Sequence, residues 1–318
     1  MSSSCSDKCG ADKQSTCGSR PAVAARENVS IDQALGRIRH KILVMSGKGG
    51  VGKSTVAVNL AVGLAGKGFR VGLMDVDLHG PDISRMLNLS DTPTTSSEGR
   101  ILPLPAGDNL RVISLENMME NRDDPIIWRG PLKYQAIRRF IADVDWGELD
   151  YLVIDAPPGT GDEPMTVAQT IKDAKALVVT TPQKVALADV RKSINFCGHV
   201  GMKVLGLVEN MSGFVCPHCG KTAELFKSGG GERLAQEFDL PFLGRIPLDP
   251  RVMLSGDDGS PFLTGGESPA VTAMSQVVAR VNAALPVATG VPHSLAATPA
   301  ATSTCGCGGK CDPNLCDC

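Results

Sequence analysis

The sequence predicts an α/β fold in which a mostly parallel β-sheet is flanked by helices on both faces. Three observations favour this class. Short, nearly continuous apolar runs recur along the chain, helical patterns separate several of them, and a glycine-rich segment joins the first run to the first long helical stretch. Parallel strands that are buried on both faces read as continuous apolar runs, and helices usually connect them.

The individual elements follow from these patterns in chain order. Apolar runs predict strands that begin with KILVMS at Lys41, VGLMD at Val71, LRVIS at Leu110, YLVID at Tyr151, ALVVTT at Ala176, KVLGLVEN at Lys203 and FLGRIP at Phe242. Helical spacing predicts helices that begin with KSTVAVNLAVGLAGKG at Lys53, PLKYQAIRRFIADV at Pro131 and VALADVRKSINFCGHV at Val185. Residues 88–109 are too irregular to assign to an element.

The chain divides into three parts. Residues 1–37 are small and polar, which is typical of a flexible arm. Residues 287–318 begin as an Ala/Pro/Thr/Ser linker and end in a Cys-rich tail. Residues 38–286 contain the predicted strands and helices and are expected to form one folded body.

Composition excludes several classes of protein. Of 318 residues, 42% are hydrophobic and 21% are charged, and the formal net charge is −2. These values are ordinary for a globular protein, and the balanced charge gives no reason to expect a nucleic-acid or membrane partner. No apolar run approaches the roughly 18 residues that cross a bilayer. The first residues lack the apolar segment of a secretory signal, so we expect a cytoplasmic protein.

The glycine-rich segment GKGGVGKST matches the phosphate-binding pattern G-x-x-x-x-G-K-[ST] between a predicted strand and a predicted helix. Glycines let the backbone wrap closely around a phosphate, and the helix N-terminus adds partial positive charge. Lys53 is expected to neutralise the β- and γ-phosphates of ATP, and the hydroxyl of Ser54 to hold Mg²⁺. The nucleotide-binding residues expected in this loop are Gly47, Lys48, Gly49, Gly50, Val51, Gly52, Lys53, Ser54 and Thr55.

A second lysine, Lys48, occupies a variable position of the same pattern. Its side chain cannot easily bend back to phosphates that its own loop binds. It is therefore either a solvated surface lysine or a catalytic residue that reaches a nucleotide on a facing subunit.

Two further segments place carboxylates after predicted strands. LMDVDLHGPDIS carries Asp75 and Asp77, and YLVIDAPPGTGDE carries Asp155. Ligands of open α/β sheets collect at the carboxyl ends of the strands, so these acids should converge on the phosphate loop. Asp155 is expected to hold Mg²⁺, directly or through water, Asp77 to orient the attacking water, and Asp75 to support the surroundings of the metal.

The stretch PPGTG, which follows Asp155 and contains Gly159 and Gly161, is interpreted as a switch segment that senses the γ-phosphate. Lone Asp residues at the ends of strands are often only turn formers. Their position beside a phosphate loop favours the functional interpretation.

The cysteines are the unusual feature of the composition. Cys216 and Cys219 form a C-x-x-C pair in CPHCG, a knuckle whose two thiolates project together while the turn directs N–H groups toward sulfur. Three interpretations are open: a thiol–disulfide redox pair, a structural zinc site, and a metal or cluster shared by two chains. A redox pair should open a helix, and a zinc site needs four ligands, for which the body has no second C-x-x-C. The shared site is therefore favoured.

The other cysteines fall into two groups. Cys197 lies on a predicted helix and is expected to be a small buried residue. The remaining ones lie near the two ends of the chain and either bind a metal or cluster or are adventitious thiols. These terminal residues are Cys5, Cys9, Cys17, Cys305, Cys307, Cys311, Cys316 and Cys318.

Together, GKGGVGKST, DVDLHGP, IIWRGPL, DAPPGTGDE, ENMSGFVCPHCG and FLGRIPLDPRV resemble the Mrp/ApbC family of iron–sulfur cluster carrier P-loop ATPases. This family belongs to the deviant Walker A class, which also contains MinD, ParA and nitrogenase iron protein. The resemblance covers about residues 38–285 and implies a P-loop NTPase fold, a cytosolic homodimer and a [4Fe–4S] cluster that passes to apo-proteins.

The resemblance also assigns roles to residues. It implies that Lys48 acts across the dimer and that Asn210 lies against adenine. It implies that Cys216 and Cys219 hold the bridging cluster. Some relatives carry four N-terminal cysteines for a second cluster, whereas this chain has three in its first 17 residues.

The main hypothesis is therefore a slow ATPase that uses ATP and Mg²⁺, forms a homodimer and delivers a cluster to apo iron–sulfur proteins. One alternative is a MinD- or ParA-like positioning ATPase, which needs a basic amphipathic helix or a basic surface. The C-terminus is instead an Ala/Pro linker followed by cysteines. The other alternative is a thiol–disulfide redox protein that uses Cys216 and Cys219.

Overall fold

A computed structural model describes residues 31–77, 80–119, 130–216 and 218–287. Its centre is an eight-stranded sheet with the strand order β10-β7-β6-β1-β5-β2-β4-β3. Every neighbouring pair is parallel except β3 and β4. The strands are β1 (Ile38–Ser46), β2 (Val71–Asp75), β3 (Leu104–Pro105), β4 (Leu110–Ile113), β5 (Leu149–Asp155), β6 (Lys175–Thr180), β7 (Lys203–Glu209) and β10 (Phe242–Arg245).

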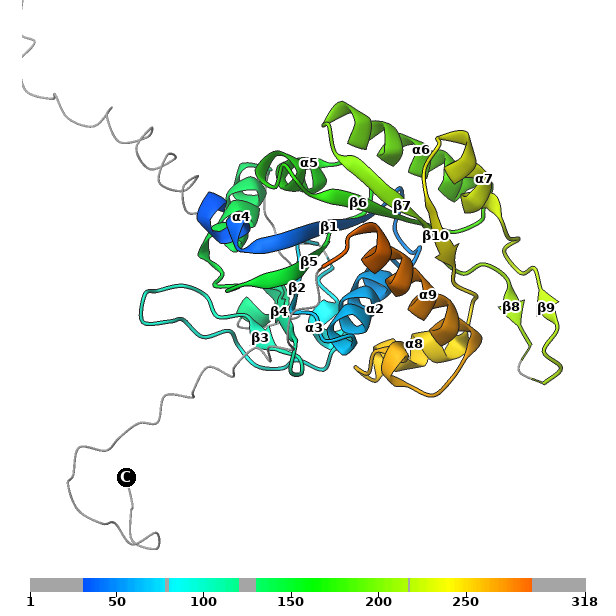
Figure 1. Cartoon of the computed structure of the whole chain (residues 1–318), viewed down its shortest axis with the longest axis horizontal. Helices are drawn as coiled ribbons and strands as arrows, with labels where there is room; N and C mark the ends of the chain where they lie inside the picture. The colour runs from blue at the N-terminus through cyan, green and yellow to red at the C-terminus, as the bar shows by residue number, and fades with distance from the viewer. Residues whose placement is uncertain (1–30, 78–79, 120–129, 217, 288–318) are drawn as a thin grey trace, which may run out of the picture.

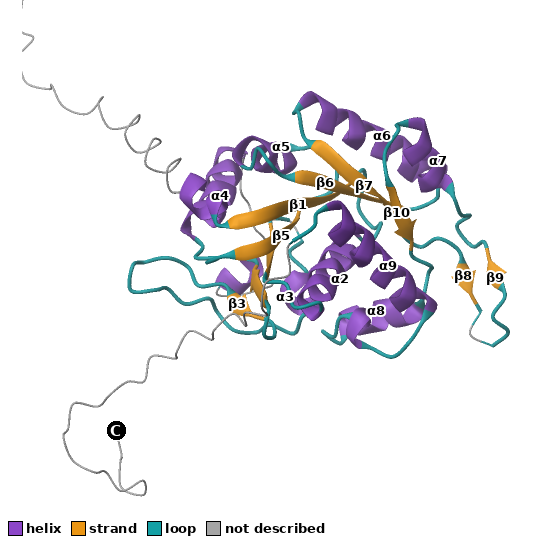
Figure 2. Ribbon diagram, viewed as in Figure 1, coloured by secondary structure: helices purple, strands orange, loops and turns teal. Residues whose placement is uncertain are grey.

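Helices cover both faces of this sheet (Figures 1 and 2). One layer consists of α2 (Lys53–Gly66), α3 (Ile83–Met86), α8 (Pro250–Asp257) and α9 (Pro269–Ala284). The opposite layer consists of α4 (Gly130–Asp143), α5 (Asp162–Thr170), α6 (Lys184–His199) and α7 (Gly230–Glu237). Two short 3₁₀ helices, η1 (Leu115–Met118) and η2 (Phe262–Thr264), lie in connecting segments. The predicted fold class is confirmed.

Each helical layer encloses its own apolar core, and the strands supply both. In β5, Leu152 and Ile154 belong to the core beneath α4–α7, whereas Tyr151 and Val153 belong to the core beneath α2 and α9. Successive side chains of a strand point to opposite faces, so a strand covered on both faces must be apolar at every position. This explains the continuous apolar runs of the sequence.

The predicted strands and helices each overlap an observed element, and two regions add detail to the prediction. Residues 31–36, which the sequence places in the N-terminal arm, are helical, and Ile31 and Leu35 are buried in the core beneath α4–α7. The irregular residues 88–109 contain the two-residue β3 and an isolated bridge between Thr95 and Ile101. Within the described ranges, no helix has both the length and the apolar character needed to cross a bilayer.

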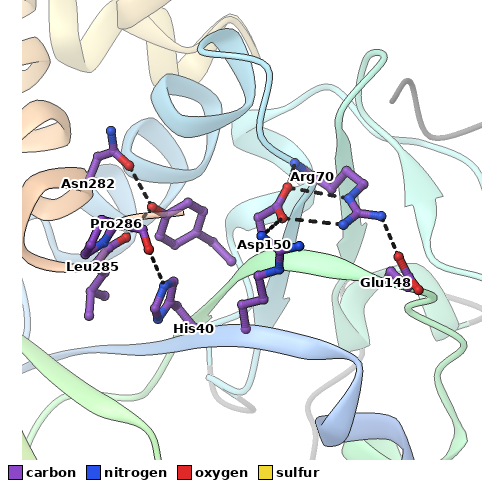
Figure 3. A network of polar contacts seen from close by, with 9 residues as sticks. His40, Arg70, Glu148, Asp150, Asn282, Leu285 and Pro286 are labelled. Atoms are coloured by element: carbon purple, nitrogen blue, oxygen red, sulfur yellow. Dashed lines mark hydrogen bonds and ion pairs between the residues drawn. The ribbon is translucent and has the colours of Figure 1, made fainter. Parts of the chain in front are cut away.

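The end of α9 is tied to the amino ends of β1 and β5 (Figure 3). The hydroxyl oxygen of Tyr151 lies 2.6 Å from the carbonyl oxygen of Leu285 and 2.8 Å from Oδ1 of Asn282. Nε2 of His40 lies 3.3 Å from the carbonyl oxygen of Pro286. The end of the described chain is therefore held at the amino edge of the sheet, away from the loops that follow the strands.

A short antiparallel hairpin, β8 (Phe214–Val215) and β9 (Thr222–Ala223), lies between β7 and α7 in the chain. Figure 1 shows it projecting from the body beyond β10. Its root is paired with the segment after β10, since the Ser212 N–H donates to the Ile246 carbonyl oxygen at 2.9 Å. The hairpin is thus attached to the body at its base.

Candidate functional site

The phosphate loop lies between β1 and α2, in the middle of the carboxyl edge of the sheet. Gly50 and Gly52 have φ angles of 75° and 79°, which residues with a β-carbon rarely adopt. A β-carbon on Gly47 would lie 2.4 Å from backbone atoms of Asp189 and Val190 in α6. The glycines of the pattern therefore allow both the tight turn and its close packing on a helix.

Lys53 opens α2, and its side chain is buried. Its Nζ lies 2.6 Å from Oδ1 of Asp155 and 3.2 Å from Oγ of Ser54. Oδ2 of Asp77 is 3.8 Å from the same nitrogen. The structure thus brings together four of the predicted site residues, and it pairs the lysine expected to meet phosphates with carboxylates of the same site.

Two buried aspartates stand side by side where β2 and β5 end. Asp75 and Asp155 are register partners and are 2% and 1% exposed. Burial raises the pKa of Asp155, while the charge and hydrogen bond of Lys53 oppose the rise. Burial, and then the charge of Asp155, raise the pKa of Asp75 well above its usual range. Asp75 accepts hydrogen bonds from the Asp77 N–H at 3.0 Å and the Ser114 hydroxyl at 3.1 Å.

The oxygen atoms beside Lys53 suit a magnesium ion. Hydroxyl and carboxylate oxygens are the hard ligands that Mg²⁺ prefers. Oγ of Ser54 and the carboxylate of Asp155 both contact the same ammonium group, so they lie close together. The residues present therefore fit Mg²⁺, which Ser54 and Asp155 would hold.

Two more predicted residues are Lys48, inside the loop, and Gly159, which contacts the base of the loop. Lys48 is half-buried, and its ammonium group has no hydrogen-bond or ionic partner among the described residues. Gly159 has a φ of 92°, and its N–H donates to the Ser46 carbonyl oxygen at 2.8 Å. The Ser46 hydroxyl in turn donates to the carbonyl oxygen of Lys48 at 2.9 Å. The segment after β5 is therefore tied to the base of the phosphate loop.

Asn210, which follows β7, braces the phosphate loop from the side. It is 7% exposed, and its Nδ2 donates to the carbonyl oxygen of Val51 at 2.9 Å. A β-carbon on Gly52 would lie 2.2 Å from this nitrogen. The glycine is thus required for the contact, and the expected approach of Asn210 to adenine stays a prediction.

Cys216 and Cys219 lie in the turn between β8 and β9. The Cys216 N–H donates to the Lys221 carbonyl oxygen at 3.0 Å, and the Gly220 N–H donates to the Cys216 carbonyl oxygen at 2.9 Å. Cys216 is half-buried and Cys219 is exposed. The N–H groups of His218 and Cys219, and then the Cys219 side chain, hydrogen-bond the sulfur of Cys216 and lower its pKa. The turn therefore favours a thiolate at Cys216.

The other cysteines are placed apart from this pair. Cys197 is buried in α6 beside Met45, and burial raises its pKa to about 11, as expected for a structural residue. The terminal cysteines of both tails lie outside the described residues. In the part of the chain that the structure describes, no group of three or more His, Cys, Asp or Glu residues is arranged to hold a metal ion. The hairpin therefore offers two thiols.

One buried acid has no motif in the sequence. Glu209 ends β7 and is 0% exposed, and its carboxylate contacts the backbone N–H groups of Gly229 and Gly231. Its signal in the sequence is an acid that closes an apolar strand upstream of a cysteine pair and a run of three glycines. An acid in a buried strand needs partners, and such a glycine run can supply them.

A family model described as the NUBPL iron-transfer P-loop NTPase, of the ParA group, matches residues 37–282. This chain belongs to that family. The iron-sulfur cluster carrier protein of Methanocaldococcus jannaschii is 44% identical over 261 residues, or 81% of this chain and 90% of that protein. The cytosolic Fe-S cluster assembly factor NUBP2 homolog of Nematostella vectensis is 46% identical over 260 residues, or 80% and 96%. The resemblance of the motifs to iron–sulfur carrier ATPases is confirmed.

Solved structures agree with this membership of the iron-transfer NTPases. A nucleotide-binding protein of Archaeoglobus fulgidus in complex with ADP is similar with a TM-score of 0.66 and 37% identity, covering 76% of this chain and 98% of that one. The cell-division ATPase MinD of Pyrococcus furiosus is similar with a TM-score of 0.59 and 25% identity, covering 77% and 99%. The fold is therefore that of a P-loop NTPase of the MinD and ParA type.

Proposed function

We propose that this iron-transfer NTPase is a slow cytoplasmic ATPase that carries a [4Fe–4S] cluster between two copies of itself and delivers it to apo iron–sulfur proteins. The observation that carries the proposal is the presentation of Cys216 and Cys219 together at the exposed turn of the β8–β9 hairpin. Two relatives with 44% and 46% identity are named as a cluster carrier and a cytosolic cluster assembly factor. Their names support both the cargo and the location.

The number of ligands supports a homodimer. Four thiolates usually hold a [4Fe–4S] cluster, and the described hairpin contributes Cys216 and Cys219. A second copy related by twofold symmetry would contribute the other two, because such an interface uses the same surface of both chains. The lowered pKa of Cys216 favours the thiolate form that binds iron.

The two alternative functions lack comparable support. A redox cysteine is activated when it opens a helix, whereas Cys216 lies in the turn of a two-stranded hairpin. The positioning ATPase MinD shares the fold at 25% identity, well below the identity to the named cluster carrier and assembly factor. The net charge of −2 gives no support for a nucleic-acid or membrane partner.

In the nucleotide site, Lys53 would exchange its contact with Asp155 for the β- and γ-phosphates of ATP. Ser54 and Asp155 would hold Mg²⁺, which supplies positive charge to the phosphates. Asp75 would support Asp155 from the neighbouring strand. The described pairing of Lys53 with Asp155 at 2.6 Å supports these roles, because the same groups are already side by side.

The remaining site residues would act around the γ-phosphate. Asp77, 3.8 Å from Lys53, would orient the attacking water. Lys48 would reach the nucleotide of the second copy, and the partnerless state of its ammonium group among the described residues supports this role. Gly159 would let the switch segment respond to the phosphate, since that segment already touches the base of the loop.

The cargo is tested by anaerobic reconstitution of the full chain with ferrous iron and sulfide. We expect the wild type to form a dimer with about four iron atoms per two chains and to pass the cluster to an apo-ferredoxin. The Cys216→Ser/Cys219→Ser variant should keep its fold and lose this iron, whereas the matched control Cys197→Ala should keep it. Iron and sulfide analysis, absorbance spectra and light scattering give the readout. Equal iron in the double variant, or a wild type that stays monomeric with ATP, iron and sulfide, would contradict the proposal.

The nucleotide role is tested by calorimetric titration with Mg·ATP. Lys53→Ala should abolish binding, because the ammonium group that meets the phosphates is lost. Lys48→Ala serves as the comparison, since it should retain binding within each chain and lower hydrolysis in the dimer. Unchanged affinity in Lys53→Ala would remove the assignment of the phosphate loop.

A further inference from the structure

A single buried carboxylate holds the root of the cysteine hairpin at both ends. Oε1 of Glu209 lies 2.8 Å from the Gly229 N–H nitrogen and 2.5 Å from the Ser212 hydroxyl oxygen. Oε2 of Glu209 accepts a hydrogen bond from the Gly231 N–H. Ser212 precedes the hairpin, and the two glycines follow it. The carboxylate therefore bridges the entry and the exit of the segment that presents Cys216 and Cys219.

The exit of the hairpin is shaped for this carboxylate. Gly229 has a φ of 75° and caps α7, so its N–H and that of Gly231 are directed at the acid. A β-carbon on Gly231 would lie 3.1 Å from Oε2 of Glu209. Arg245 of β10 adds an ion pair at 4.0 Å. The N-terminus of a helix favours a negative charge. Glu209 supplies that charge at the N-terminus of α7 from within the protein.

Asn210, the next residue in the chain, contacts the phosphate loop. Asn210 follows Glu209 directly, and its Nδ2 donates to the carbonyl oxygen of Val51 at 2.9 Å. Met211 has a φ of 56°, a conformation that is unfavourable for a residue with a side chain, and its Cε would lie 3.9 Å from a β-carbon on Gly52. Contacts to the nucleotide loop and to the hairpin root are therefore made within four consecutive residues, 209–212.

We infer that Glu209 is a positioning residue that couples the phosphate loop to the cysteine hairpin. This inference rests on the proposed function, because it concerns how the cluster thiols are presented. A shift of the Val51 carbonyl when nucleotide binds displaces Asn210 and the end of β7. Because the Glu209 carboxylate holds both ends of the hairpin, the hairpin follows as one unit instead of fraying at one strand.

The inference is tested by hydrogen-exchange mass spectrometry of the full chain with and without Mg·ATP. In the wild type, nucleotide should change the exchange rates of amides in residues 212–229. Glu209→Gln preserves size but replaces one acceptor oxygen with an NH₂ group, so it cannot accept all the bonds that Glu209 accepts. The response of residues 212–229 should fall by about fivefold or more, the lower end of typical coupling. Protection of residues 47–55 by nucleotide should remain.

Glu224→Gln is the matched control, because Glu224 is an exposed acid of the same segment that bonds Ser228. It should respond like the wild type. A wild-type response in Glu209→Gln, or a hairpin in the wild type that is indifferent to nucleotide, would overturn the inference. If circular dichroism shows Glu209→Gln to be unfolded, Ser212→Ala removes only the entry bond, and an undiminished response in that variant would overturn it equally.

This experiment separates the inference from the proposed function. Exchange is measured without iron, so a hairpin that responds to nucleotide through Glu209 supports the coupling even when reconstitution fails. Failed reconstitution rejects the cluster carrier. Successful reconstitution with an indifferent hairpin rejects the coupling alone.

Discussion

The charges beside the phosphate loop are concentrated on a few buried side chains. Lys53 contacts Asp155 at 2.6 Å and Asp77 at 3.8 Å, and Asp75 is the register partner of Asp155 on the next strand. The single ammonium group of Lys53 is thus the positive charge shared by the carboxylates of Asp75, Asp77 and Asp155. Since burial favours the neutral form of an acid, the pKa of Asp75 is raised well above its usual range. An ionised Asp75 is therefore a source of instability in the folded chain.

Asp75→Asn tests this conclusion through pH. The wild type loses stability as pH rises from about 4 through the raised pKa, because the folded chain must release a proton that the unfolded chain releases more easily. The variant has no such proton. Without nucleotide, it should match the wild type near pH 4 and be more stable than the wild type at pH 8.

Thermal unfolding between pH 4 and pH 8 provides the measurement. Asp108→Asn, at an exposed turn residue, is the control and should follow the wild type at every pH. If the stability difference between Asp75→Asn and the wild type did not change with pH, this result would contradict the raised pKa of Asp75.

For single residues, the sequence predicts only those site residues that a local spacing pattern marks. The pattern G-x-x-x-x-G-K-[ST] fixes the residue type and the position of Lys53 and Ser54, and the end of an apolar strand marks Asp155. The bond from Asn210 to Val51 joins residues 159 positions apart, so no local pattern indicates it. The role of Glu209 is missed for the same reason, because its partners Gly229 and Gly231 lie about twenty residues further along the chain, after the hairpin.

At the scale of elements, the phosphate loop is held by its neighbours as well as by its own turn. Gly47 packs on the backbone of α6, where a β-carbon would lie 2.4 Å from Asp189 and Val190. Gly49 differs, because a β-carbon there meets nothing nearer than Pro158 at 3.8 Å. The two glycines of one loop therefore serve different purposes, and the packing of α6 fixes the start of the loop.

Paired alanine variants test this difference. Gly47→Ala should lower the free energy of unfolding by about 1–3 kcal/mol, because backbone atoms must move apart. Gly49→Ala should leave it unchanged or slightly higher, since alanine restricts the unfolded chain. Urea unfolding followed by circular dichroism measures both. An equal loss in the two variants would mean that the packing on α6 contributes nothing.

The elements themselves could be predicted where they are long and buried. The strands β1, β5 and β6 each contain a run of four consecutive buried residues that are apolar or aromatic, because helices cover both faces of the sheet. The strands β8 and β9 have two residues each, which is too short for a periodic pattern. The hairpin that carries the cysteines was therefore visible in the sequence only as a C-x-x-C pair.

For the molecule as a whole, the sheet and both helical layers are built from residues between 31 and 287. The family match, residues 37–282, falls within the same limits. The contacts of Tyr151 with Asn282 and Leu285 close this unit by fixing the end of α9 to the sheet. The sequence placed the boundary of the body at residue 38, seven residues after the helical turn that Ile31 begins, because a short helix gives little periodic signal.

Removal of residues 1–20 and 305–318 tests whether the unit is sufficient for nucleotide chemistry. We expect the ATPase rate of the truncated chain to stay within about twofold of the full chain, because every predicted nucleotide-site residue is retained. Phosphate release at saturating Mg·ATP gives the rate. A large loss would show that the terminal segments belong to the catalytic unit.

The 2.6 Å contact between Lys53 and Asp155 has a consequence for selectivity. If a polyphosphate without a cation bound Lys53, Asp155 would lose its counter-charge. A buried carboxylate without a counter-charge is costly. If the polyphosphate bound together with a divalent cation, the cation would replace Lys53 as the counter-charge of Asp155. We therefore expect the loop to bind a polyphosphate together with a divalent cation more tightly than a polyphosphate alone, so that cation and nucleotide would act as a single ligand.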